Sequence, residues 1–240
     1  MDAQFEFLLR LGDNSLVLGQ RLAEWLGHAP VTEEDIASAN ISLDLVGQAR
    51  LWLTHAGRLE GKGRDEDALA YQREQHEYRN CTMVELPNGD FAFTVVRLFL
   101  FDGYQRRLLG RLSHCPDAEV AAIAAKSKKE VDYHFRHSAD WVIRLGDGTE
   151  ESHRRAQAAL DQLWAYTHEL FAPDGVDPGA ASLRAPWLAD VQAVLAEATL
   201  EIPQDTQFLS HGRRGAHSEH LGYLLAEMQV LHRAHPGAQW

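Results

Sequence analysis

Cysteine is scarce in this sequence. The 240 residues include two cysteines, Cys81 and Cys115, and neither belongs to a CxxC pair or to the Cys/His spacing of a zinc site. Two isolated thiols in a chain of this size are typical of a reduced, cytosolic protein. The count excludes a small fold held together by disulfides, and it predicts a cytoplasmic location.

Long hydrophobic runs are also lacking. The most apolar window, residues 91–101, is interrupted by Arg97 and is much shorter than the ~20 residues that cross a bilayer. The first residues, MDAQFEFLLRLGD, have no basic segment and reach Asp13 before an apolar stretch develops. This pattern is not that of a signal peptide. We therefore expect neither a membrane anchor nor secretion.

Basic residues are outnumbered. Lys and Arg total 23 against 35 Asp and Glu, which gives a formal net charge of −12. An acidic surface repels phosphate backbones and anionic lipid headgroups, so nucleic acid and membrane surfaces are excluded as first partners. Hydrophobic residues make up 45% of the chain, which is ordinary for a soluble globular protein and excludes a disordered or collagen-like one.

What is present is helical periodicity along nearly the whole chain. In the first helix, apolar or small residues recur at steps of three and four, at Leu8, Leu11, Ser15, Leu18, Leu22 and Trp25. Similar spacing predicts helices over residues 32–55, 91–112, 117–145, 150–171, 188–200 and 217–233, with one long loop over residues 172–187. The segment 32–55 is apolar on nearly all sides, which predicts a buried helix. We predict a single all-α domain over residues 1–240, built on a helix bundle.

Each of the four longest early helices places a carboxylate on or beside its apolar stripe. These residues are Asp13, Asp44, Asp102 and Glu130, and His134 lies one turn beyond Glu130. Carboxylates from four helices of a bundle, together with histidine, are the ligands of di-iron and di-manganese sites. Such a site needs Glu-x-x-His on two of the helices.

The spacing does not meet that requirement. Gly47 stands three residues after Asp44, and Tyr133 stands three residues after Glu130, so that His134 is one residue late. One residue is a rotation of about 100° around a helix. We therefore predict no catalytic residue and no metal ligand in this chain, but a metal-free polar core whose carboxylates pair with Arg or Lys and hydrogen-bond to Asn40, Gln48 and Tyr133.

A second group of histidines lies near the end of the chain, at His211, His217 and His220. Because GRRG separates the first two, we interpret them as exposed polar residues rather than ligands. No nucleotide-binding glycine motif, nucleophile elbow or iron–sulfur cysteine set occurs. Any redox chemistry would therefore use metal and electrons held elsewhere.

Five long phrases resemble one family over nearly the whole length, the C subunits of the ring-1,2-phenylacetyl-CoA epoxidases. They are LGDNSLVLGQRLAEWLGHAP, ISLDLVGQARLWL, YQREQHEYRNCTMVELPNGDFAFTVVRLFLFD, KSKKEVDYHFRHSADWVIRLGDGTEES, and EHLGYLLAEMQVL through PGAQW. Phrases of this length are far more specific than a short motif.

The resemblance implies a ferritin-like four-helix bundle core with additional C-terminal helices, in one member of a heteromeric monooxygenase complex. In that family the A subunit holds the di-iron centre and binds the CoA thioester, whereas the C subunit has lost the centre. This chain is then a non-catalytic structural subunit of phenylacetate catabolism, without a cofactor of its own. Its polar core would be the vestige of a di-metal site lined by Asp13, Asp44, Asp102, Glu130 and His134.

Several alternatives stay open at this point. The resemblance does not say whether the B subunit, the reductase or a second copy of this chain contacts it. An independent di-metal oxidase or oxygenase would use the same five polar residues as ligands. A homomeric helical scaffold protein would have no oxygenase partner at all.

Overall fold

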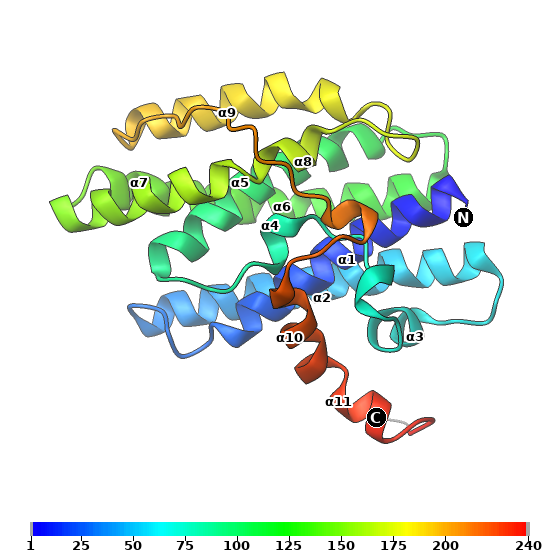
Figure 1. The fold of residues 1–240 in the computed structure, drawn as a ribbon. Helices are drawn as coiled ribbons and strands as arrows, with labels where there is room; N and C mark the ends of the chain where they lie inside the picture. Colours follow the sequence, from blue (N-terminus) through cyan, green and yellow to red (C-terminus); the bar gives the residue numbers. More distant parts are fainter. Residues whose placement is uncertain (1, 239–240) are drawn as a thin grey trace. The chain divides into compact units, whose positions relative to one another are not determined.

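A computed structural model describes residues 2–238, and within that range the chain forms eleven α-helices, three short 3-10 helices and no β-strand (Figure 1). The predicted all-α class is confirmed. None of the helices in this range is both long and apolar enough to cross a membrane.

The chain divides into two compact units. The first unit contains the residues up to Pro87 and those from Ser210 onward, and the second contains residues 88–209. The second unit is therefore an insertion in the sequence of the first. The single domain expected over residues 1–240 stays a prediction.

Two long helices form the centre of the first unit. Helix α1 (Ala3–Glu24) begins at Asp2, whose side chain accepts a hydrogen bond from the Gln4 amide, and α2 (Thr32–Glu60) runs back beside it (Figure 1). The helices approach closely where Ser42 Oγ donates to Gly19 O at 2.8 Å. The same unit holds α3 (Glu66–Tyr71), α4 (Thr82–Glu85), α10 (Glu219–Met228) and α11 (Val230–Ala234).

The exposure of α2 differs from the prediction. Ile41, Leu45 and Leu53 are buried as expected, but Ile36 and Leu43 are exposed. The two sets point in different directions around the helix, so α2 has one apolar face that packs against the core and another that is exposed to solvent. The expectation of a helix buried on all sides is wrong.

The second unit is built around α5 (Phe91–Leu112), which contacts α6 (Ala118–Gly146), α7 (Glu150–Trp164) and α9 (Arg184–Glu197). Helix α5 begins at Asp90, whose carboxylate accepts from the Phe93 amide at 2.9 Å, and most of its residues are buried. Trp187 of α9 is fully buried and donates from its indole nitrogen to Leu100 O at 3.0 Å. This bond fixes α9 against α5.

Three predicted helix boundaries are wrong. The helix expected over residues 150–171 is interrupted after Trp164 and resumes as α8 (Thr167–Phe171). The expected loop over residues 172–187 contains a 3-10 turn and the start of α9 at Arg184. The helix expected over residues 217–233 is divided into α10 and α11 at Gln229.

Candidate functional site

The five predicted site residues are divided between the two units. Asp13 of α1 and Asp44 of α2 belong to the first unit, whereas Asp102 of α5 and the α6 residues Glu130 and His134 belong to the second. Asp13, Asp102 and His134 are fully buried, and Asp44 and Glu130 are half-buried. Within residues 2–238, no three or more His, Cys, Asp or Glu side chains gather into a metal-binding group.

Both carboxylate oxygens of Asp13 have partners in the first unit. Arg73 donates one guanidinium nitrogen to Oδ1 and a second, at 3.0 Å, to Oδ2, and the Arg79 amide donates to Oδ2 at 2.8 Å. Arg73 is as deeply buried as Asp13. Burial acts to lower the pKa of Arg73, but the Asp13 carboxylate outweighs it and raises that pKa. Asp13 is therefore the anion of a buried ion pair.

Tyr78 extends this ion pair toward the end of the chain. The Arg73 guanidinium lies 4.3 Å from the centre of the Tyr78 ring, and Gln229 donates to the Tyr78 hydroxyl at 2.9 Å. Burial raises the pKa of the Tyr78 hydroxyl, which keeps the hydroxyl neutral. The residues around Asp13 thus connect α1 to the segment after α10.

Asp102 has a different environment. It is fully buried in the second unit, and neither of its carboxylate oxygens has a hydrogen-bond partner among the described residues. Burial raises the pKa of Asp102 well above its usual range. A carboxyl group in this situation holds its proton, because the charged form loses hydration without gaining a partner.

Of the remaining predicted residues, Asp44 and Glu130 are half-buried, whereas His134 is fully buried. Glu130 lies 4.0 Å from the Lys126 ammonium, one turn earlier on α6. The His134 ring meets the Tyr133 ring edge-on, with 6.3 Å between centroids. Tyr133 and Asn40, expected in the polar core, are exposed.

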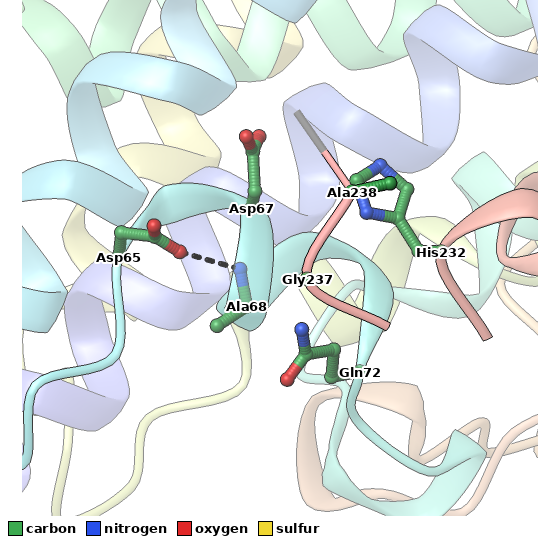
Figure 2. Close-up of a pocket in the computed structure, with 7 residues that line it drawn as sticks. All are labelled: Asp65, Asp67, Ala68, Gln72, His232, Gly237 and Ala238. Atoms are coloured by element: carbon green, nitrogen blue, oxygen red, sulfur yellow. Dashed lines mark hydrogen bonds between the residues drawn. The ribbon is translucent and has the colours of Figure 1, made fainter. Parts of the chain in front are cut away.

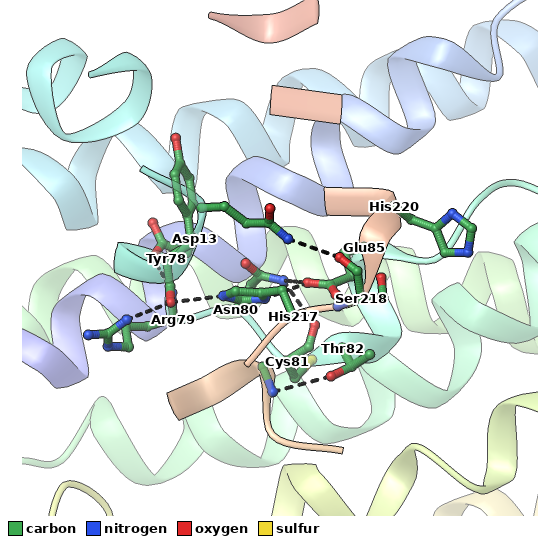
Figure 3. A network of polar contacts seen from close by, with 12 residues as sticks. Asp13, Tyr78, Arg79, Asn80, Cys81, Thr82, Glu85, His217, Ser218 and His220 are labelled. Carbon is green, nitrogen blue, oxygen red and sulfur yellow. Dashed lines mark hydrogen bonds and ion pairs between the residues drawn. The ribbon is translucent and has the colours of Figure 1, made fainter. Parts of the chain in front are cut away.

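A second buried polar network in the first unit was not predicted (Figure 3). His217 lies directly before α10, and its Nδ1 is 2.7 Å from Glu85 Oε2 at the end of α4. Its Nε2 is 3.0 Å from Tyr78 O, and the side chains of His217 and Glu85 are fully buried. Both ring nitrogens thus face acceptors, and only the imidazolium can donate to both. The expectation of an exposed His217 is wrong.

Glu85 is the centre of this network. It accepts from Asn80 Nδ2 at 2.7 Å and from the Ser218 amide at 2.6 Å, in addition to His217. Burial acts to lower the pKa of His217, but the hydrogen bond and charge of Glu85 raise it. Arg21 of α1 donates to Glu85 O at 2.8 Å and to His220 O at 3.1 Å. The network therefore fastens the segment around residue 217 to α1 and α4.

One described pocket, of about 240 Å³, adjoins the network around Asp13, because Gln229 is part of its lining. Two larger pockets include none of the residues of the two networks. One of about 500 Å³ lies beside α3 (Figure 2), and its lining consists of Asp65, Asp67, Ala68, Gln72, His232, Gly237 and Ala238. The Asp65 carboxylate in it already accepts from the Ala68 amide at 2.8 Å, as the cap of α3. Another, of about 300 Å³ in the second unit, includes Arg154 and Arg155, which both pair with Glu151.

The whole chain matches one protein family. The family is described as "Phenylacetic acid catabolic protein", and the match covers residues 1–240. The chain belongs to this family. A curated relative, the C subunit of the 1,2-phenylacetyl-CoA epoxidase of Escherichia coli strain K12, is 49% identical over 243 residues, which cover 98% of each chain. The resemblance that the sequence phrases indicated is confirmed, as is the ferritin-like, all-α class.

Membership places this protein among subunits of phenylacetate catabolism. The relative is named as one subunit of an epoxidase, so such a subunit works with others. In this chain Asp13 pairs with Arg73 and not with other candidate metal ligands. This pairing is the feature of the site that bears most directly on whether the chain holds a metal.

Proposed function

We propose that this protein is a non-catalytic structural subunit of a ring-1,2-phenylacetyl-CoA epoxidase in aerobic phenylacetate degradation. It pairs in the cytoplasm with a catalytic A subunit that holds the di-iron centre. The observation that carries the proposal is the 49% identity with an epoxidase C subunit across 98% of both chains. Identity at this level over the whole length supports a shared role as well as a shared fold.

The non-catalytic part of the proposal is supported by Asp13. A metal-ligating carboxylate needs a lone pair directed at the ion, and Arg73 and the Arg79 amide occupy both oxygens of Asp13. Releasing Asp13 to a metal would leave the Arg73 guanidinium buried without its anion, which is strongly unfavourable. The Asp13 position therefore serves stability.

The contribution of such a subunit is mechanical. A helix-on-helix interface with the A subunit buries apolar surface and steadies the helices that carry the metal ligands. The B subunit and the reductase would complete the assembly. Iron, dioxygen and the thioester substrate all belong to the partner under this proposal.

Co-expression with an epoxidase A subunit tests the pairing. We expect a complex that survives size-exclusion chromatography and contains both chains. An A subunit that elutes entirely separately from this chain would overturn the proposal. A matched control is co-expression with an unrelated helical-bundle protein, which should not be retained.

Metal analysis of the chain purified alone tests the non-catalytic role. After growth with ample iron and manganese, we expect near-zero metal together with a helical circular-dichroism spectrum. About two metals per chain would show instead that the five polar residues assemble a site. That outcome is the expectation of the alternative, an independent di-metal oxidase, which the unpartnered Asp102 carboxyl favours.

A further inference from the structure

Helix α2 presents an apolar surface to solvent at its middle. The side chain of Leu43 is 69% exposed and that of Ile36 is 57% exposed. Along the same face, the exposed residues continue at steps of three and four through Asn40, Gly47 and Arg50, and then Arg58. Residues with this spacing lie on one side of a helix. We call these residues the α2 stripe.

The α2 stripe is complementary to itself when reversed. Leu43 and Gly47 are equally far from position 45, as are Asn40 and Arg50. A second, antiparallel copy of α2 that crosses the first at position 45 would therefore place Leu43 of each copy over Gly47 of the other. It would also place Asn40 of each copy opposite Arg50 of the other. A twofold interface requires this reciprocity, in which residue i meets j and j meets i.

Gly47 provides space for Leu43, the most exposed apolar member of the stripe. A Cβ atom built on Gly47 has nothing within 4 Å, so the surface around it is open. A leucine side chain facing a glycine lets two helices approach closely, as a ridge on one helix enters a groove on the other. Without an occupant, an exposed glycine in the middle of a helix only costs stability.

The charges of the helix favour the same orientation. The first turn carries the exposed Glu33, and the second half carries the exposed arginines Arg50 and Arg58. An antiparallel arrangement brings Glu33 of one copy toward Arg58 of the other, and it opposes the two helix dipoles. A parallel arrangement would bring like charges together.

We infer that the α2 stripe is a contact between two copies of this chain, related by a twofold axis near position 45 of α2. The occupant is a second copy because the shape and the charge pattern of the stripe match their own reverse. The apolar area is small, so we expect the dimer to be weak and its population to depend on protein concentration. The inference concerns the chain alone and does not depend on the epoxidase partner.

The substitution Gly47→Leu tests the contact. In the monomer the new side chain enters open space and improves helix propensity, so the fold is retained and the melting temperature does not fall. In the dimer it collides with Leu43 of the other copy. By sedimentation velocity across a micromolar concentration series, we expect a monomer–dimer equilibrium for the natural chain and a weakening of at least tenfold for Gly47→Leu.

A control and a rescue make the test specific. Leu231→Asp changes a leucine on α11 that is 55% exposed and lies outside the α2 stripe, and it should leave the dimer intact. Glu33→Arg and Arg58→Glu should each weaken the dimer. The double variant should restore it, because opposite charges then face each other again with their positions exchanged.

Two results would overturn the inference. One is a natural chain that stays monomeric throughout the concentration series. If Gly47→Leu in addition abolishes retention of the A subunit, the α2 stripe binds the A subunit rather than a second copy. The other is a folded Gly47→Leu chain that dimerises as well as the natural one. Failure to retain the A subunit in co-expression, by contrast, would bear only on the proposed function.

Discussion

The imidazole of His217 lies 2.7 Å from the carboxylate of Glu85, across 132 positions of sequence, and solvent reaches neither side chain. The second ring nitrogen faces Tyr78 O at 3.0 Å. Because His217 donates on both sides, its raised pKa is a direct consequence of where the ring sits. The stability of the first unit must therefore depend on pH.

The pH dependence has a definite sign. The pKa of His217 is raised in the folded chain, so the stabilisation is fully present below the unfolded value of about 6.5 and is lost as pH rises through the folded value. In urea unfolding at pH 6 and pH 9, we expect Glu85→Gln to remove most of this loss. A tenfold difference in proton affinity between the folded and unfolded chain corresponds to about 1.4 kcal/mol. Glu151→Gln, which changes an exposed carboxylate, is the control, and an equal pH slope in Glu85→Gln and the natural chain would refute the argument.

Removing the carboxylate of Asp13 should be severely destabilising. Asp13→Ala leaves the buried Arg73 without its anion, and breaking a buried pair in this way costs roughly 3–5 kcal/mol. We expect poor folding or assembly, measured by the denaturation midpoint and by the yield of the complex with the A subunit. Asp44→Ala, at a half-buried position, should cost less. Iron per assembled catalytic subunit should stay unchanged, and a proportional loss of iron would contradict us.

Asp102 predicts a different pH effect in the second unit. Its pKa is raised by burial, so folding becomes less favourable as pH rises from the unfolded value of about 3.9 toward the folded value, by about 1.4 kcal/mol per pH unit. Asp102→Asn keeps the shape and cannot ionise. We expect the variant to have a flatter stability profile than the natural chain as pH rises above about 4, by at most that slope. A variant that is less stable than the natural chain at pH 7 would show that the charged form is the one that the fold needs.

The close approach of Gly146 to the segment after α9 predicts a packing defect. A Cβ on Gly146 would collide with the backbone carbonyl of Ala198, which cannot rotate away. We expect Gly146→Ala to cost about 1–3 kcal/mol in thermal or urea unfolding. Gly110→Ala is the matched control, because its Cβ would meet only Lys128 Cε at an ordinary 3.7 Å. Equal stability of the two variants would contradict the prediction.

The long helices could be predicted from the sequence because apolar residues recur with the helical repeat where a helix packs against its neighbours. The steps of three and four along α6 arise because one side of the helix faces a core, whereas α1 and α5 keep helical spacing although most of their residues are buried. The break after Trp164 could not, since no proline or glycine marks it. In α2, Ile41 and Leu45 are buried while Ile36 and Leu43 form an exposed face, and the apolar pattern alone does not tell a buried face from an exposed one.

The polar networks could be predicted only in part, because their interacting residues lie far apart in the sequence. The carboxylate of Asp13 could be singled out because it interrupts an apolar stripe, but its partner Arg73 lies 60 positions away. His217 is expected to be exposed because its neighbours are polar and glycine-rich, although its ring is held by Glu85 and Tyr78. Only the return of the chain from the second unit brings His217 to Glu85 and Tyr78.

The insertion of residues 88–209 between the two parts of the first unit also sets an order of events during synthesis. Glu85 leaves the ribosome long before His217, and in the interval its carboxylate has no imidazolium to meet. A chain halted before Ser210 would keep that deficit permanently, along with the apolar surface that α10 covers. Such a product exposes apolar surface, which favours aggregation and degradation over folding.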